Sequence, residues 1–209
     1  MKITLKDGSV KEYGQAMSII DIAKDISEGL ARVACAGEVN GEVKDLRTVI
    51  DADCELNILT ANDPKGLAVY RHTTAHVMAE AVKRLFPEAK LTIGPAVDNG
   101  FYYDFDSEIT FGATELAAIE KEMTRIVKEN LKIERFVLPR EEALALVKEM
   151  NEPYKVLLIE RIPEGEEVSF YRQGEFTDLC AGPHLFSTGA VKAIKLTSCT
   201  GAYWEGKSE

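Results

Sequence analysis

All three histidines of this 209-residue chain lie in two short segments that are far apart in the sequence. Residues 71–76 read RHTTAH and hold His72 and His76, while residues 178–184 read DLCAGPH and hold His184 with Cys180. If the first segment is helical, its two imidazoles project from one face, one turn apart. The Gly-Pro pair in the second segment predicts a turn rather than a helix. A fold that brings both segments together would collect three imidazoles and a thiol, so we expect one shared site.

Several kinds of chemistry fit such a group. A zinc metallopeptidase has two histidines at this spacing with a glutamate directly after the first. Thr73 takes that place here, so the general base is missing and we reject this class. A zinc site would use His72, His76, Cys180 and His184 as three nitrogens and one thiolate. A metal-free hydrolytic pocket would use the same side chains to position water and substrate. Ordinary burial of the histidines is the remaining interpretation, and their concentration in two motifs disfavours it.

Composition indicates a globular protein. At 209 residues the chain can hold one large or two modest domains, and 45% hydrophobic residues are enough for real cores. No apolar run approaches the length of a membrane span. Residues 1–5 alternate between polar and apolar side chains and lack the apolar core of a signal peptide. We therefore expect a cytoplasmic protein with no membrane partner.

The cysteines and the net charge exclude further classes. Cys35, Cys54, Cys180 and Cys199 form no CxxC pair, so we expect no structural disulfide in a reducing compartment. The net charge of −10, from 25 basic and 35 acidic residues, argues against a nucleic-acid surface over the whole chain. Any RNA contact would need local basic patches or parts of a protein outside this sequence.

The first sixty residues predict strands around one helix. Polar–apolar alternation on both sides of Asp7-Gly8 predicts a hairpin. Ser18 is a good N-cap for an amphipathic helix that ends at Gly29. Short strands should follow, with a turn at residues 40–41, over residues 32–36, 48–50 and 55–59. This order of elements predicts a β-grasp fold.

The rest of the chain predicts alternating helices and strands. A polar linker at residues 62–66 marks a domain boundary, and a long helix should run from about residue 67 to 86, before Pro87. Thr114 should cap a second long helix, which Asn130 ends. We further expect an aromatic strand over 101–106, a strand over 131–138, helices over 139–150 and from Pro153, a hairpin over 168–179 and a last strand over 193–199.

These motifs together resemble a known family. The first sixty residues look like a TGS domain, the ubiquitin-like module of threonyl-tRNA synthetases, some GTPases and stringent-response enzymes. His-x-x-x-His followed by Cys-x-x-x-His resembles the editing domain of threonyl- and alanyl-tRNA synthetases. Further stretches resemble the threonyl branch: YRHTTAH from Tyr70, IGP from Ile93, DNGFYYD from Asp98, YK at Tyr154, CAGPH from Cys180 and GAYW from Gly201.

The resemblance covers essentially the whole chain and implies an α+β protein. A small ubiquitin-like β-grasp domain is expected at residues 1–62, and a larger α/β editing, or second additional, domain at residues 63–209. In that family a class II catalytic core and an anticodon-binding domain follow, and nothing in this sequence resembles them. ATP, magnesium and the synthetase's own zinc are expected only in that core. The parent enzyme is expected to be a homodimer, and this part alone a monomer.

The activity that the resemblance implies is hydrolysis of serine wrongly attached to threonine tRNA, whose acceptor end would be the partner. Catalytic roles are implied for His72 near the terminal ribose hydroxyls and the attacking water, Cys180 in the pocket wall, Asp178 on the α-ammonium, and Lys155 on the oxyanion or ester. Substrate-binding roles are implied for His76 as a support, His184 beside Cys180, and Tyr103 beside the amino acid or the terminal adenosine.

Several alternatives stay open. Lys155 could equally be a solvated helix residue and Tyr103 a core residue. We expect editing to need no cofactor, with a zinc bound by His72, His76, Cys180 and His184 as the alternative. A free-standing trans-editing deacylase is a second possible function. A non-catalytic RNA-binding or docking module with a structural zinc is a third.

Overall fold

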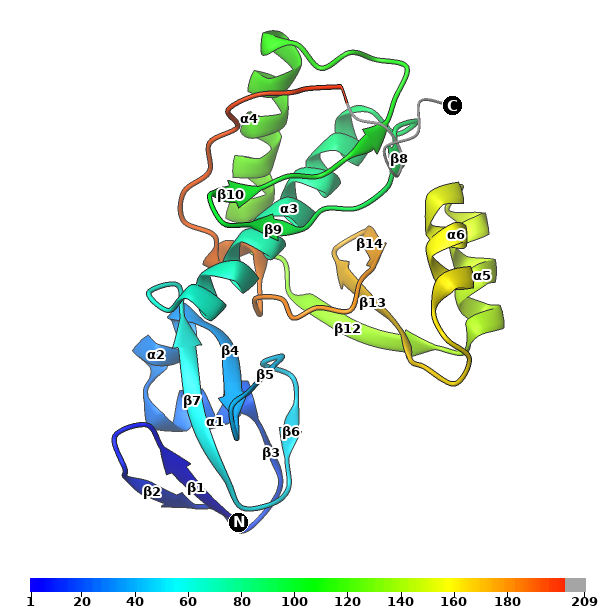
Figure 1. Ribbon diagram of the computed structural model, residues 1–209. Helices are drawn as coiled ribbons and strands as arrows, with labels where there is room; N and C mark the ends of the chain where they lie inside the picture. The colour runs from blue at the N-terminus through cyan, green and yellow to red at the C-terminus, as the bar shows by residue number, and fades with distance from the viewer. Residues whose placement is uncertain (202–209) are drawn as a thin grey trace.

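The N-terminal part is a five-stranded sheet with strand order β2-β1-β7-β4-β5 (Figure 1). The computed structural model describes residues 1–201. β1 pairs antiparallel with β2 and parallel with β7, which therefore lies in the middle of the sheet. This is the predicted β-grasp order. The strands span Lys2–Leu5 (β1), Val10–Glu12 (β2), Ala34–Val39 (β4), Glu42–Lys44 (β5) and Cys54–Thr60 (β7), and a separate pair joins Met17–Ser18 (β3) to Val49–Ile50 (β6).

Two short helices, not one, follow the first hairpin. α1 (Ile19–Ile26) begins at Ser18, as predicted, and buries its apolar face against the sheet. The predicted continuation to Gly29 is wrong, because the first helix ends before Ser27 and a second helix, α2 (Glu28–Val33), begins after it. The Ser27 side chain accepts hydrogen bonds from two backbone N–H groups of the next turn, so it caps a new helix. The following strand consequently starts later than the sequence indicates.

The long helix α3 (Pro64–Leu85) joins the sheet to the rest of the molecule (Figure 1). Asp63 caps its first turn, where Pro64 needs no hydrogen-bond partner for a backbone N–H. The helix therefore begins before the predicted residue 67. Its inward side chains belong to one hydrophobic cluster that spans both parts of the chain and includes Cys35, Ala36, Leu59, Val69, Val77, Ile119, Met123 and Ile126. The two parts thus share a continuous core.

The predicted aromatic strand over residues 101–106 is divided into two short pieces. β10 (Gly100–Phe101) pairs with β9 (Ala96–Val97), and β11 (Phe105–Asp106) pairs with β8 (Lys90–Leu91). Between the pieces Tyr103 is buried, and its ring lies against the backbone of Gly94, where a β-carbon would collide with it. The strand is therefore interrupted at Tyr103, because this side chain packs inward and the regular hydrogen-bond pattern of a continuous strand is not formed there.

α4 (Ala113–Glu129) packs along α3. Its N-cap is Gly112 rather than the predicted Thr114, because the Glu115 carboxylate accepts the hydrogen bond of the Gly112 N–H. Asn130 ends the helix as predicted, in the left-handed conformation with φ of 51°.

A three-stranded antiparallel sheet, β12-β13-β14, ends where the segment of Cys180 and His184 begins. The predicted hairpin and both predicted helices are confirmed. The elements are Ile133–Leu138 (β12), Arg140–Glu149 (α5), Pro153–Arg161 (α6), Val168–Gln173 (β13) and Phe176–Leu179 (β14). Helices and strands therefore mix as the α+β class requires.

The predicted last strand over residues 193–199 is wrong. After a single 3-10 turn, Thr188–Ala190, the described chain has no regular structure. The backbone N–H of Lys192 donates to the Tyr70 hydroxyl, and that of Leu196 donates to the Glu120 carboxylate. Side chains therefore take the hydrogen bonds that a neighbouring strand would have taken. Of the GAYW motif, residues 202–204 lie outside the described residues.

Within the described chain, no helix is both long and apolar enough to cross a membrane.

Candidate functional site

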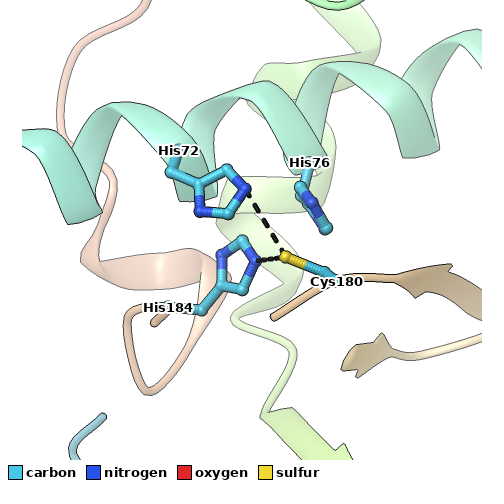
Figure 2. A group of neighbouring side chains, drawn as sticks. All are labelled: His72, His76, Cys180 and His184. Carbon is cyan, nitrogen blue, oxygen red and sulfur yellow. Dashed lines mark hydrogen bonds between the residues drawn. The ribbon is translucent and has the colours of Figure 1, made fainter. Parts of the chain in front are cut away.

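His72 and His76 lie one turn apart on the same face of α3, as the spacing predicts (Figure 2). His72 is half-buried and His76 is buried, with 4% of its surface exposed. Their ring centroids are 5.1 Å apart in an edge-on arrangement. A helix of this length fixes both rings relative to each other, so α3 forms one rigid wall of the site.

The turn after β14 brings Cys180 and His184 against this helix face (Figure 2). The His184 ring lies 4.3 Å from the His72 ring and 4.2 Å from the His76 ring, centroid to centroid. Cys180 Sγ lies 3.5 Å from His72 Nε2 and 3.3 Å from His184 Nε2. All four potential ligand atoms lie within 4.8 Å of one another. The two distant segments therefore form one cluster, named here the His/Cys cluster.

The donor set of the His/Cys cluster fits a zinc ion. Bond lengths of about 2.3 Å to sulfur and about 2.0–2.1 Å to nitrogen, at tetrahedral angles, separate the two ligand atoms by about 3.5 Å. The Cys180 distances to the two imidazoles agree with that value. The same distances also suit direct hydrogen bonds between thiol and imidazole, so geometry alone allows both states.

Thr73 supports His184 from the helix side. Its hydroxyl lies 3.0 Å from His184 Nδ1 and accepts a hydrogen bond from the Leu185 N–H at 3.0 Å. Thr73 is fully buried. In the sequence this residue only excluded a metallopeptidase, whereas in the fold it orients the imidazole ring of the opposing turn.

Asp178, Lys155 and Tyr103 form a buried polar network beside His76. Lys155 Nζ lies 2.8 Å from Asp178 Oδ1 and 3.1 Å from the Tyr103 hydroxyl, which donates to Asp178 Oδ2 at 2.6 Å. His76 Nε2 lies 3.6 Å from the same Oδ2 atom. The Lys155 and Asp178 side chains are only 4% and 2% exposed. The interpretation of Lys155 as a solvated helix residue is therefore wrong.

Within this network one carboxylate oxygen keeps unused capacity. Asp178 Oδ1 makes the close ion pair with Lys155, but the contact does not have hydrogen-bond geometry, and no other donor among residues 1–201 reaches this atom. A carboxylate oxygen accepts two hydrogen bonds, so Oδ1 can still receive a donor.

Burial favours the uncharged forms of the three imidazoles and of the Cys180 thiol. It lowers the pKa of His76 to about 3, lowers that of His72, and holds that of His184 well below the usual 6.5. It raises the pKa of the Cys180 thiol to about 12, against the opposing effect of the Gly182 N–H. Near pH 7 each imidazole therefore has one accepting and one donating nitrogen.

Tyr103 also lines a cavity of about 570 Å³, together with Phe105, Tyr154 and Arg161. None of the four side chains of the His/Cys cluster lines this cavity. Burial and the Asp178 charge raise the pKa of Tyr103 well above 10, so its hydroxyl stays protonated and remains a donor. Tyr103 consequently connects the cavity to the network around Asp178.

Sequence reasoning missed the residues that hold the 180–185 turn. Tyr171 packs edge-on against the His184 ring at 4.5 Å, and its hydroxyl donates to Asp45 Oδ2 at 2.7 Å. Asp45 and its neighbour Arg47 come from the N-terminal part of the chain. Their only signal in the sequence is their position in a turn, which predicts no contact with a distant histidine.

Comparison with known families gives a match at each end of the chain. Residues 1–60 match the TGS domain, and residues 168–209 match the threonyl and alanyl tRNA synthetase second additional domain. The second match includes Cys180 and His184, whereas His72 and His76 precede it.

Over its whole length the chain is similar to the N-terminal region of bacterial threonine–tRNA ligases. It is 61% identical over 209 residues to the threonine–tRNA ligase of Acetivibrio thermocellus, covering 100% of this chain and 33% of the relative. The corresponding enzymes of Caldanaerobacter subterraneus and Clostridium tetani are 59% and 60% identical over 206 residues, 99% of this chain and 32% of each relative. The chain thus spans about a third of the length of these relatives.

Proposed function

We propose that this chain hydrolyses serine from wrongly charged threonine tRNA, as the editing part of a threonine–tRNA ligase. The single observation that carries the proposal is the cluster of His72, His76, Cys180 and His184 beside the buried Lys155–Asp178 pair. It lies in a chain whose whole length is similar to threonine–tRNA ligases and whose C-terminal part matches the second additional domain.

The need for such a site follows from the chemistry of the two amino acids. Serine lacks one methyl group of threonine, and a missing methyl group in a synthetic pocket is worth only about 1–3 kcal/mol of discrimination. A second pocket must then destroy the error. It should admit serine and reject the extra methyl group by crowding, since overpacking a well-packed site typically costs about 1–3 kcal/mol.

In the proposed mechanism, neutral imidazoles position the water. His72 and Cys180 are the two half-buried members of the cluster, and His72 is the only imidazole of the two, so its ring can face substrate and solvent. Its neutral ring can accept a proton from water or donate to a ribose hydroxyl near the ester. Cys180 and His184 close the opposite wall, with the thiol as a weak hydrogen-bonding group rather than a nucleophile, because burial keeps it protonated.

The Asp178–Lys155 pair would bind the seryl group. The free capacity of Asp178 Oδ1 can accept the α-ammonium, which fixes where the side chain of the amino acid falls. Lys155 can stabilise the oxyanion that develops on the ester carbonyl. His76 lies 3.6 Å from Asp178 and would support the carboxylate from behind. Tyr103 would lie beside the amino acid or the terminal adenosine, for which the adjacent aromatic cavity offers stacking surfaces.

We propose that hydrolysis needs no metal. The support is that Cys180, His184 and Thr73 satisfy one another's hydrogen bonds without one. If zinc binds, His72, His76, Cys180 and His184 would hold it. With all four bound it would stabilise the fold, and with one displaced it would supply an activated water.

For the parent protein we propose attachment of threonine to its tRNA, in a homodimer whose catalytic core uses ATP, magnesium and zinc. We further propose that the chain divides into residues 1–62 and 63–209, because α3 begins at Pro64 after the last strand of the sheet ends at Thr60. The threonine tRNA acceptor end is then the partner of the second part.

The deciding experiment incubates the chain with seryl- and threonyl-tRNA(Thr) and measures release of each amino acid. We expect serine to be released and threonine to be spared, with release lost in His72→Ala. Equal release of both amino acids would overturn the editing proposal. Tight tRNA binding with one zinc per chain and no release would favour a docking module instead. A free-standing trans-editor would show undiminished activity without any ligase core.

A further inference from the structure

Residues 1–60, which match the TGS domain, are named here the TGS part. Two of its side chains reach the turn that carries His184. Asp45 and Arg47 lie between β5 and β6, and their side chains are only 11% and 17% exposed. Arg47 Nη1 lies 2.9 Å from Asp45 Oδ1, so the two form an ion pair that faces into the molecule. Long polar side chains on the surface of a small domain are normally solvated. Their burial here shows that the second part of the chain covers them.

Arg47 binds backbone carbonyl oxygens of two segments in the second part. Its Nε donates to the Ile133 carbonyl at 2.9 Å, and its Nη2 contacts the same oxygen. Nη1 donates to the His184 carbonyl at 3.2 Å, and Nη2 donates to the Leu185 carbonyl at 2.8 Å. The planar guanidinium thereby ties the start of β12 to the His184 turn, a fork geometry that a lysine ammonium cannot reproduce.

Asp45 holds the same turn from the other side of the His184 peptide. Its Oδ2 accepts the His184 N–H at 3.1 Å and the Tyr171 hydroxyl at 2.7 Å. Burial alone would raise the pKa of Asp45, but the Arg47 charge and the hydrogen bonds from Tyr171 and Arg47 lower it, so the carboxylate stays ionised. Both backbone polar groups of His184 are therefore bound by side chains of the TGS part.

The turn passes through three environments within three residues. His184 enters the His/Cys cluster, Leu185 enters the core that α3 and α4 share, and Phe186 packs against the core of the TGS part. The guanidinium of Arg47 lies over the Phe186 ring, 5.5 Å from its centroid. A shift of the TGS part would consequently pull directly on the His184 backbone.

We propose that Asp45 and Arg47 are positioning residues of the His/Cys cluster, so that the TGS part is a working component of the editing site. They act through the backbone of His184, and Thr73 then orients its ring. The activity measured in the test rests on the proposed function. A second measurement, the chemical accessibility of Cys180, does not.

The test uses the full chain with two conservative substitutions. Asp45→Asn keeps the shape of the side chain but replaces one carboxylate oxygen with an amide NH₂ group, which is a donor. In one orientation this group faces the His184 N–H and the Tyr171 hydroxyl, and in the other it faces the Arg47 guanidinium, so two donors meet in either case. Arg47→Lys keeps the charge and loses the fork. Asp51→Asn and Arg32→Lys are matched controls, because both residues are exposed on the same part of the chain.

We expect both variants to lower kcat for serine release by up to about 100-fold, the effect of misplacing a reacting group by about 1 Å, with little change in tRNA affinity. The rate of Cys180 alkylation by iodoacetamide, followed on its peptide by mass spectrometry, should rise several-fold, because His184 and Gly182 no longer shield the sulfur. Both measurements are made well below each variant's unfolding midpoint. The controls should match wild type in both.

Wild-type kcat and a wild-type alkylation rate in both variants would overturn the inference. Weaker tRNA binding with unchanged kcat would also overturn it, since the contact would then serve RNA docking. If the wild-type chain releases no serine, the editing proposal fails, and the alkylation rates alone decide whether Asp45 and Arg47 hold the turn. The double variant Tyr171→Phe with Asp45→Asn should have a kcat no lower than that of the less active single variant, because both substitutions act on one turn.

Discussion

Removing the Asp178 carboxylate should destabilise the fold as well as the site. In the Asp178→Ala chain, Lys155 would keep a buried ammonium whose one remaining hydrogen-bond partner in the described part of the chain is the Tyr103 hydroxyl, 3.1 Å away. Breaking a buried ion pair by deleting one partner strands the other charge in a medium that solvates it poorly. The loss of activity in this variant would then have two causes, which a stability measurement separates.

The magnitude follows from the geometry of the pair. Unit charges separated by the observed 2.8 Å attract by about 6 kcal/mol at an effective dielectric constant of about 20, and desolvation of both groups offsets part of this. We expect the free energy of unfolding to fall by about 3–5 kcal/mol. Native domains are stable by only about 5–15 kcal/mol, so the variant should be marginal at 37 °C.

The assay is urea unfolding at 25 °C of wild type, Asp178→Ala, Lys155→Met and the double variant. Asp51→Ala is the control for an exposed aspartate, with an expected change of about 0.5 kcal/mol or less. The double variant should lose less than the sum of the singles, because no charge is left stranded. An unfolding free energy of Asp178→Ala within about 1 kcal/mol of wild type, or strict additivity of the singles, would refute this reasoning.

Three further predictions address the His/Cys cluster. His72→Ala and Cys180→Ala should each abolish most release of serine while the chain still unfolds cooperatively in urea; full activity in both would mean that the site lies elsewhere. Dialysis against a chelator should leave the rate of serine release unchanged, whereas a loss that zinc restores would contradict the metal-free mechanism. Burial lowers the pKa of His76 to about 3, so between pH 6.5 and 3 the unfolded chain binds a proton there that the folded chain excludes. The free energy of unfolding should therefore decrease as the pH is lowered through this range, by up to about 1.4 kcal/mol per pH unit for each such histidine. His76→Gln should make this decrease less steep.

The sequence by itself determined most of the local elements. Apolar periodicity and punctuating residues predict the first hairpin, α3, α5, α6 and the β13–β14 hairpin, because these elements depend on contacts close in the chain. The errors occur where another donor or acceptor competes. Ser27 starts a new helix, and Glu115 accepts the Gly112 N–H and so sets the start of α4. The backbone N–H groups of Ala193 and Leu196 donate to the side chains of Tyr70 and Glu120 instead of forming a ladder.

The sequence also predicted which residues would gather in the site, since the three histidines and Cys180 stand out in a histidine-poor chain. It left Lys155 and Tyr103 between a functional and an ordinary role. Tertiary structure shows that Lys155 is buried rather than solvated, and that Tyr103 is a core residue whose hydroxyl also donates to Asp178. The arrangement joins α6, the segment between β10 and β11, and β14, and the functional roles of both residues stay proposals.

Tertiary structure alone revealed the contribution of Asp45 and Arg47. These residues lie in a polar turn, and such turns are normally solvated, so no local pattern distinguishes them. Their role depends on the shared core that brings the TGS part against the His184 turn, where the unpaired backbone groups of that turn need partners. Hydrogen-bond demand in one segment is satisfied by side chains more than a hundred positions away, as the separations of 137 and 139 residues show, and only the folded chain brings the two together.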